Sequence, residues 1–552
     1  MLSPTPDPLR IAMNRVTFGA RDTEVRNARV IGWPEWVGNQ LGAPSGDDLD
    51  VDAHLKTQTM RILYNAPAAG DTRGKWVATD EIRPLNYANA DLSLLWDVNA
   101  RSGTVFSYTE RARINQELAA CTWIRNTHSR YQLREFMTDF WHNHFNIGKN
   151  ENATATSLLP IYDRKAIRPH VFGNFRAMLE ANATSASMLI YLDNWISNAT
   201  TPNENYAREI MELHTLGGGA YYGTAAASTV PKGDNGVALG FTDQDIVQAS
   251  RVLSGWTIQN SQRGDAGVNV PSTGEFIFIA RLHNREAGNL LGVSMAASNS
   301  PISATSNTVI PGSLNNNNTS QGRKFLDILA AHPATATFIV TKLAKRIFGD
   351  SPPQAVIDRG IAAWRANQAA ADQIAQVLRA ILLDGTEIMT ALVTKVRRPY
   401  ERIIAMARTT DMVVNAGTFM ENYLNPVDDG LFTWPAPDGR PDANAYWMAT
   451  GATLASWNYL FALPNNAAFA SRPLAAQSPL ETLGSPTLIV EYWVGRMVGH
   501  QLSNAAMQSL VADQASNSGV PAAVKLNRAT NIENAHRRLV SLIATTEEFS
   551  LR

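Results

Sequence analysis

The amino-acid sequence predicts a mainly α-helical protein: a large multi-helix domain with long structured loops and at most a small β-hairpin or sheet. Two observations lead to this class. Apolar residues recur at helical spacing in blocks such as 323-RKFLDILAAHPATATFIVTKLAKRIFG-349 and 373-QIAQVLRAILLDG-385, and each block ends at a glycine that favours a helix end. Few segments alternate with the period of two that is typical of strands, and 274-GEFIFIARL-282 is the exception.

We interpret residues 1–552 as a single elaborated helical domain, because neither an internal repeat nor a Pro/Ser-rich linker divides the chain. Two irregular segments interrupt the helical pattern. Residues 259–322 form a loop-rich insertion of Gly, Asn and Ser, with 313-SLNNNNTSQG-322 as a flexible tip. Residues 424–447 combine prolines, turn residues and tryptophans. Long structured loops of this kind often carry function.

The charge balance and the cysteine count exclude several classes of function. The formal net charge is -1, which gives no global electrostatic case for a nucleic-acid or anionic lipid partner. The single cysteine, Cys121, can form neither an internal disulfide nor a multi-thiolate metal site. We expect no membrane span, because no apolar run reaches about 18 residues. The given chain also shows no signal-peptide pattern at its start.

The segment 131-YQLREFMTDFWHNHFNIG-148 predicts a helix that ends before Gly148. At about 100° per residue, His144 falls on the apolar face and His142 on the opposite face, about 160° away. The two rings could reach one metal ion only if the helix unwinds near Asn143. The alternative interpretation is that both histidines are structural residues with satisfied hydrogen bonds.

A second helix is predicted in 201-TPNENYAREIMELHTLGGG-219. Thr201 would be its N-cap, with Glu204 completing a capping box, and Gly217 would end it. Its apolar face carries Tyr206 and His214, so His214 is expected to be packed.

The polar face of this second helix carries the best acid/base pair in the chain. Glu209 and Glu212 are three residues apart and therefore adjacent, and Asn205 and Arg208 lie beside them. The ordinary interpretation of such a pattern is a solvated ladder of charges. The apolar flanks of the segment favour the lining of a cleft instead.

Two weaker signals point to binding. Trp256 and Trp434 could stack on sugar rings, although most tryptophans in a chain with 13 of them belong to the core. Lys342, Lys345 and Arg346 form a basic helical edge that could bind a carboxylate or a phosphate, and a solvated face is the commoner explanation.

Several blocks together resemble one bacterial family, the domain of unknown function 1800. They include 140-FWHNHF-145, 203-NENYAREIMELHTLG-217, 242-TDQDIVQASRVLSGW-256 and 283-HNREAGNLLG-292. The resemblance implies a mostly helical protein that is exported, hence periplasmic or extracellular, and encoded beside a sulfatase-like partner. It implies no established reaction. Its hallmark positions fall on Trp141, His142, Asn143, His144, Asn203, Glu204, Asn205, Arg208, Glu209, Glu212, Gly255 and Trp256, whereas Asn284 departs from the usual aspartate.

Our preferred hypothesis is a carbohydrate-active enzyme that cleaves a polysaccharide or oligosaccharide by acid/base chemistry, without a cofactor. A hydrolase would use Glu209 and Glu212, with Asp193 as a possible second carboxylate. A lyase would use His142 or Tyr206 as the base, while Asn143 and Arg208 neutralise a uronate carboxylate. The predicted catalytic residues are His142, Glu209, Glu212 and Tyr206, and the predicted substrate-binding residues are Asn143, Asn205, Arg208, Asp193, Trp256 and Trp434.

Two alternatives stay open. The first is a hydrolase or oxidoreductase that depends on a divalent metal held by His142, His144 and Glu209 or Glu212. The second is a non-catalytic export or assembly partner, in which the polar residues form a buried network that fixes helix packing.

Overall fold

The computed structural model describes residues 2–42, 48–148, 153–261, 271–297, 310–311, 320–390, 395–417, 424, 429–465, 472–517 and 529–552. Most of the predicted flexible tip at 313–322 lies outside these residues. Within them the chain is mainly helical, which confirms the predicted fold class.

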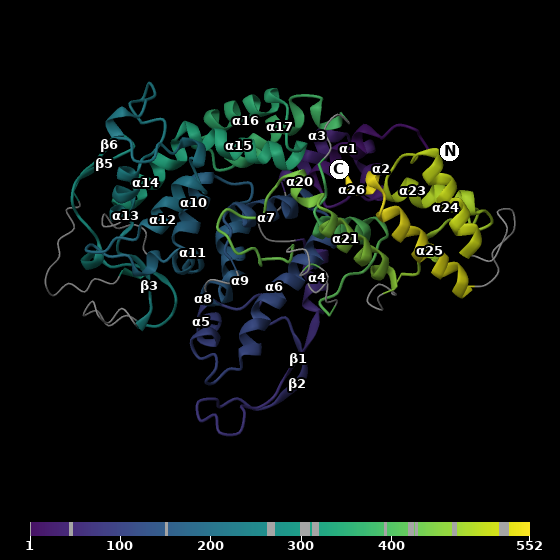
Figure 1. Ribbon diagram of the computed structural model, residues 1–552, viewed down its shortest axis with the longest axis horizontal. Coiled ribbons are helices and arrows are strands. Elements are labelled where there is room, and N and C mark those ends of the chain that lie inside the picture. Colours follow the sequence, from purple (N-terminus) through teal and green to yellow (C-terminus); the bar gives the residue numbers. More distant parts are fainter. Residues whose placement is uncertain are drawn as a thin grey trace.

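The first half of the chain begins beside the C-terminal helices, passes through the middle and reaches the opposite end of the molecule (Figure 1). Its helices are α1 (Pro8–Val16), α2 (Asp22–Ile31), α3 (Trp33–Leu41), α4 (Leu49–Lys56), α5 (Leu92–Ala100), α6 (Tyr108–His128), α7 (Gln132–His144), α8 (Ala153–Ser157), α9 (Leu159–Tyr162), α10 (Phe175–Ala183), α11 (Ala186–Tyr191), α12 (Glu204–Glu212) and α13 (Asp243–Leu253). A π-helical turn, η1 (Asp163–Ile167), follows α9 directly.

The second half returns across the middle and ends in a separate helical group around α23 to α25 (Figure 1). Its helices are α14 (Ser320–Ala331), α15 (Pro333–Phe348), α16 (Gln354–Ala366), α17 (Gln373–Leu383), α18 (Pro399–Thr409), α20 (Asn444–Trp447), α21 (Thr450–Ala462), α22 (Leu474–Gln477), α23 (Pro486–Met497), α24 (Asn504–Asn517), α25 (Ala529–Ala544) and α26 (Glu547–Ser550). The predicted block 323–349 is thus divided at Pro333, which cannot donate a hydrogen bond inside a helix.

The described strands form small antiparallel sheets. The first pairs β1 (Thr59–Tyr64) with β2 (Thr79–Pro84) in a hairpin that projects from the helical body (Figure 1). The second has the order β3 (Trp256–Ile258), β4 (Phe276–Phe278), β7 (Ile310–Pro311), and the third pairs β5 (Gly288–Leu290) with β6 (Val293–Met295). The predicted strand 274–282 is therefore β4, shorter than expected and placed inside a sheet.

One cluster of buried apolar side chains extends from Ala12 in α1 to Phe549 in α26. Helix α7 lies in the middle of the molecule and contributes Phe136, Met137 and Trp141 to this cluster. Because α7 is almost fully surrounded, its C-terminal end brings the FWHNH residues into contact with segments from both halves of the chain.

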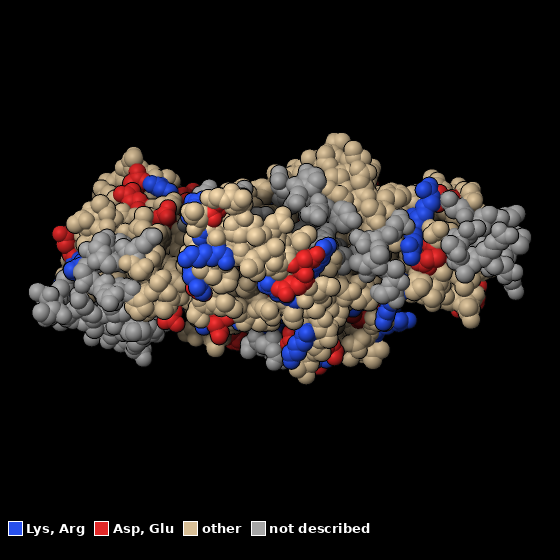
Figure 2. Space-filling view, turned by 90° about the horizontal axis from the view of Figure 1, so that it is seen from below, with Lys and Arg blue, Asp and Glu red and all other residues tan. Residues whose placement is uncertain are grey.

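The described surface has no large area of one charge on the face seen in Figure 2, where acidic and basic side chains are interspersed. None of the described helices combines the length and the apolar character that crossing a bilayer requires.

Candidate functional site

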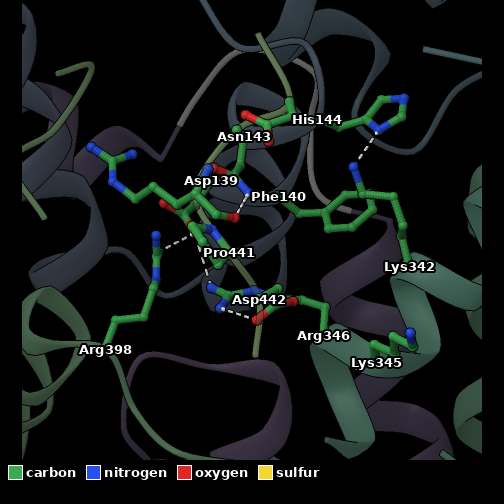
Figure 3. Close-up of a pocket in the computed structure, with 13 residues that line it drawn as sticks. Asp139, Phe140, Asn143, His144, Lys342, Lys345, Arg346, Arg398, Pro441 and Asp442 are labelled. Atoms are coloured by element: carbon green, nitrogen blue, oxygen red, sulfur yellow. Dashed lines mark hydrogen bonds and ion pairs between the residues drawn. The ribbon is translucent and has the colours of Figure 1, made fainter. Parts of the chain in front are cut away.

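The two histidines of the FWHNH segment point in different directions, as the helical projection predicts. Helix α7 continues through His144, so no unwinding brings the rings together. The buried His144 ring receives a hydrogen bond from Lys342 Nζ at Nδ1 (3.1 Å, Figure 3). Its Nε2 donates to the carbonyl oxygen of His214 at 3.0 Å. Burial, together with Lys342 and His214, holds the pKa of His144 well below its usual value, so the ring is neutral.

His142 belongs to a separate polar cluster on the other side of α7. Its Nε2 donates to the Asp163 carboxylate at 2.8 Å, and Arg168 donates to the same carboxylate at 2.8 Å and to Glu135 at 3.0 Å. Burial alone would raise the pKa of Asp163, but Arg168 and His142 outweigh it and keep the carboxyl ionised. The π-helical turn η1 places Asp163 at this position.

Asn143, between the histidines, holds the irregular 429–447 loop. Its amide forms two hydrogen bonds with the backbone of Arg440: Arg440 N–H donates to Oδ1 at 2.7 Å, and Nδ2 donates to the Arg440 carbonyl at 3.0 Å. Asn146 donates to the carbonyl of Ala436 at 2.7 Å. Gly439 has φ +77°, and a Cβ there would lie 2.1 Å from the Asn143 carbonyl oxygen. Asn143, predicted to bind substrate, thus positions the loop.

Removing the Asn143 amide should destabilise the protein without creating a cavity in the apolar core. We expect Asn143→Ala to lower the free energy of unfolding by about 2 kcal/mol, because it leaves two backbone groups of Arg440 without partners. Chemical denaturation monitored by circular dichroism measures this change. The exposed Asn205 is the matched control, and an equal loss in Asn205→Ala would contradict the positioning role.

The 429–447 loop, the end of α7 and helix α15 enclose a pocket of about 260 Å³, which we call the basic pocket (Figure 3). Its lining residues are Asp139, Phe140, Asn143, His144, Lys342, Lys345, Arg346, Arg398, Asp438, Gly439, Arg440, Pro441 and Asp442. Five of these side chains are cationic and three are carboxylates. Glu401 and Asp429 lie behind the lining and pair with Arg346, Arg398 and Arg440, so Lys342 and Lys345 are the lining cations without an ion pair to a described carboxylate.

A buried network of ion pairs forms the floor of the basic pocket. Arg346 and Arg398 both bind the Asp139 carboxylate, at 2.9 and 2.6 Å. Arg346 also binds Glu401 at 2.6 Å. Lys395 binds Asp442 at 2.9 Å. Since these cations already have carboxylate partners, they hold α7, α15 and α18 together beneath the pocket.

Lys342 differs from these buried cations. It forms no ion pair with any described carboxylate, and its Nζ lies 3.1 Å from the neutral His144 ring and 5.3 Å from the centre of the Phe338 ring. Burial lowers the pKa of Lys342 to about 8, although Asp442 and Asp438 oppose the fall.

Glu209 on helix α12 is not among the residues that line the pocket, but Asp438 of the lining acts on its carboxyl group. Burial raises the pKa of Glu209 to about 6; the adjacent Glu212 adds to the rise, Arg208 opposes it, and Asp438 of the pocket rim contributes to it. Asp438 raises the pKa of both Glu209 and Lys342, so this carboxylate lies within electrostatic range of both groups.

The sequence profile of a family described as "Protein of unknown function (DUF1800)" matches residues 11–551. The chain belongs to the DUF1800 family. No curated protein and no solved structure matches it.

In this DUF1800 chain the other predicted residues of α12 face away from the pocket or into the core. Arg208 donates to the Tyr221 hydroxyl at 3.2 Å and lies 3.6 Å from Asp243. Tyr206 is buried, and burial raises the pKa of its phenol well above the usual value, which makes it unsuitable as a base. Asn205 is exposed.

The N-cap predicted for this helix is wrong. Asn203 caps α12 by accepting a hydrogen bond from the Tyr206 backbone N–H at 3.1 Å. Thr201 instead closes a local turn with Asn198, whose Nδ2 donates to the Thr201 hydroxyl at 2.7 Å. Asp193 is exposed with φ +59°, and its carbonyl accepts from Asn203, so this residue supports the start of α12.

The predicted sugar-stacking role of Trp256 is wrong, because the ring is 0% exposed and packs edge-on against Phe276. Trp434 is half-buried, its ring meets the edge of Tyr446, and its carbonyl is bound by Asn146. His214 is buried, as expected.

The DUF1800 chain does not bring His142, His144 and Glu209 together as metal ligands. The two imidazoles contact groups on opposite sides of α7, and both ring nitrogens of His144 already have partners. Among the described residues, no group of three or more His, Cys, Asp or Glu side chains is arranged to hold a metal ion. The described residues therefore do not form the predicted metal site of His142, His144 and Glu209.

Sequence reasoning missed the residues that complete the two polar clusters. Asp163, Glu401 and Asp442 carry no local pattern that separates them from surface carboxylates. The basic helical edge of Lys342, Lys345 and Arg346 was the one sequence pattern that pointed to this pocket. The interpretation of this edge as a solvated face is wrong for Arg346, which is 3% exposed.

Proposed function

We propose that the protein is a carbohydrate-active enzyme that binds one acidic sugar unit in the basic pocket and breaks the adjacent bond by acid/base chemistry. The observation that carries this proposal is a pair of groups with displaced pKa values: Lys342, which lines the basic pocket, and Glu209, which is within electrostatic range of Asp438 in the same lining. A volume of about 260 Å³ suits a single sugar unit rather than a long chain.

Two lining cations, Lys342 and Lys345, have no ion pair to a described carboxylate and favour a sugar that carries a carboxylate. Lys342 in its ammonium form has donors left after its hydrogen bond to His144, and no described carboxylate occupies them. An ammonium held in a buried site stabilises the negative charge that develops when the proton α to a carboxylate is removed.

The arrangement of the glutamates favours elimination over hydrolysis. Glu209 and Glu212 project from one turn of α12, whereas a glycosidase places its two carboxyl groups on opposite sides of the bond. With a pKa of about 6, Glu209 is mostly ionised at neutral pH and can remove a proton from the carbon α to the bound carboxylate. In this proposal Glu209 takes the role of base that was expected of His142 or Tyr206. Lys342 takes the role of neutralising the carboxylate that was expected of Asn143 and Arg208.

A screen of acidic and neutral oligosaccharides tests the proposal. Elimination creates a double bond conjugated to the carboxylate, so ultraviolet absorbance and reducing ends should rise together with a uronate substrate and not with a neutral one. Reducing ends without absorbance would show hydrolysis instead. If no substrate gives either signal, the non-catalytic alternative gains support. In that alternative the side chains of Asn143 and His142 serve only to hold neighbouring segments through the hydrogen bonds that they form with Arg440 and Asp163.

Lys342→Met should weaken this activity. We expect kcat/KM to fall by about tenfold to a hundredfold, because a hydrogen bond to a charged group is lost. The exposed Lys56 on α4 provides a control substitution, Lys56→Met, which should leave kcat/KM unchanged. An unchanged kcat/KM in Lys342→Met would remove the basic pocket from the reaction.

A further inference from the structure

Lys342 is a half-buried lysine of the basic pocket, and its amine contacts a neutral ring and no described carboxylate. Lys395, which is fully buried, donates to Asp350 at 3.2 Å and to Asp442 at 2.9 Å, so its ammonium form is stabilised. Lys342 donates to Nδ1 of His144, whose Nε2 proton is directed to the His214 carbonyl. An imidazole in this tautomer can only accept from the lysine.

Burial is the condition that disfavours an ammonium ion at this position. The Phe338 ring, 5.3 Å from Nζ, and the carboxylates of Asp438 and Asp442 favour the charged form, but desolvation outweighs them. Desolvation of this kind is one condition that turns a lysine into a nucleophile. Because the pKa is lowered to about 8, roughly a tenth of the amine is free of its proton at pH 7.

We propose that Lys342 forms a covalent imine, through Nζ, with a small aldehyde or ketone that also carries a carboxylate. The carbonyl supplies the reacting carbon, and the carboxylate matches Lys345, the other lining cation without an ion pair to a described carboxylate. Compounds of this class, such as 2-oxo acids, fit within about 260 Å³.

The step balances without an oxidant or a reductant. The lone pair of the neutral amine attacks the carbonyl carbon, the carbonyl π pair moves to oxygen, and the proton released by nitrogen passes to that oxygen. The carbinolamine hydroxyl then takes up a proton from water and leaves as water while the nitrogen lone pair forms the C=N bond. The resulting iminium returns that proton when it loses its N–H proton. Hydrolysis reverses the sequence and restores the free lysine.

Imine formation requires neither Glu209 nor a glycosidic bond, so it stands apart from the proposed cleavage of a sugar. Failure to detect an imine would leave the proposed sugar cleavage untouched, and the reverse also holds. Both proposals use the basic pocket, but sugar cleavage uses the ammonium form of Lys342 to bind an anion, whereas imine formation uses its neutral amine to attack a carbonyl.

Reductive trapping of the full-length protein tests the inference. Glyoxylate is added with sodium cyanoborohydride, which reduces imines, and the modified lysines are mapped by peptide mass spectrometry. Glycolaldehyde, of similar size but without the carboxylate, is the matched probe. We expect glyoxylate to label Lys342 faster than any other lysine, and glycolaldehyde to show a smaller preference for it. The preference should disappear when the protein is unfolded in urea.

Two variants make the test specific. Lys342→Arg keeps a cation but cannot form an imine, so the label at this position is lost while surface labelling stays the same. Lys56→Met removes an exposed lysine of α4 that does not line the pocket, and it should leave the label on Lys342 unchanged. Two results would overturn the inference: labelling of the lysines in proportion to their exposure, or an equal preference for Lys342 with both probes. Both results are read from the labelled lysines of the wild-type protein, so the test stands even if Lys342→Arg does not fold.

Discussion

Replacing Glu209 by glutamine is expected to lower kcat on a uronate substrate by about a thousandfold, because the amide cannot accept the substrate proton. In the wild-type protein the rate should rise as the pH passes about 6, where the Glu209 carboxyl loses its proton, and fall as the pH passes about 8, where Lys342 loses its positive charge. The rate of release of the unsaturated product, measured from pH 4 to 10, records both limbs.

The rise of the rate near pH 6 distinguishes a role of Glu209 as proton acceptor from a purely structural role. In Glu209→Gln the remaining activity should lack the limb near pH 6, whereas the limb near pH 8 should persist. Glu35, an exposed carboxylate on α3, is the control, and Glu35→Gln should leave the profile unchanged. A variant at position 209 with full activity, or with an unaltered acidic limb, would exclude Glu209 as the proton acceptor.

The largest effect on stability is expected for Glu401→Gln. The Glu401 carboxylate is 2% exposed and lies 2.6 Å from Arg346, 3.6 Å from Arg552 and 3.8 Å from Arg398. An amide leaves these guanidinium groups buried without their shared counter-charge, which should lower the free energy of unfolding by about 3 kcal/mol. Denaturant unfolding measures the difference, with Glu387→Gln as the control.

Glu387 pairs with Arg359 at 2.9 Å on a partly exposed surface, so its substitution should cost less than about 1 kcal/mol. Equal losses in the two variants would contradict the importance of the buried network. Burial alone would raise the pKa of Glu401, but Arg346, Arg552 and Arg398 outweigh it and lower the pKa from 4.5. This stabilisation is therefore present above pH 4.5 and is lost as the pH falls below it, and Glu401→Gln should reduce this loss.

Local patterns predicted the parts of the site that depend on a single helix. The spacing of apolar residues in 131–148 was sufficient to separate His142 from His144, because side-chain directions in a regular helix follow from the sequence interval. The adjacency of Glu209 and Glu212 has the same origin. The cap of α12 was misplaced because Thr201 and Asn203 are both good caps, and the Asn198 turn already uses Thr201.

Contacts between distant segments decided the rest of the site. Lys342 meets His144 across 198 positions of sequence, and Arg440 meets Asn143 across 297. Whether a lysine on a helical edge is solvated or enclosed depends on which segment covers it, and no local rule supplies that segment. The pKa values of Glu209 and Lys342 are likewise set by burial and by Asp438 of the 429–447 loop.

The sequence by itself determined the helical class, the family and the directions of the side chains along each motif helix, since these follow from periodicity and from short residue patterns. Only the tertiary structure decided that Trp256 is buried and that Asn143 holds a loop. It also decided that the basic edge of α15 lines a pocket with Asp438 and Asp442. The physical reason is that desolvation and charge pairing act between elements that the chain brings together only when it folds.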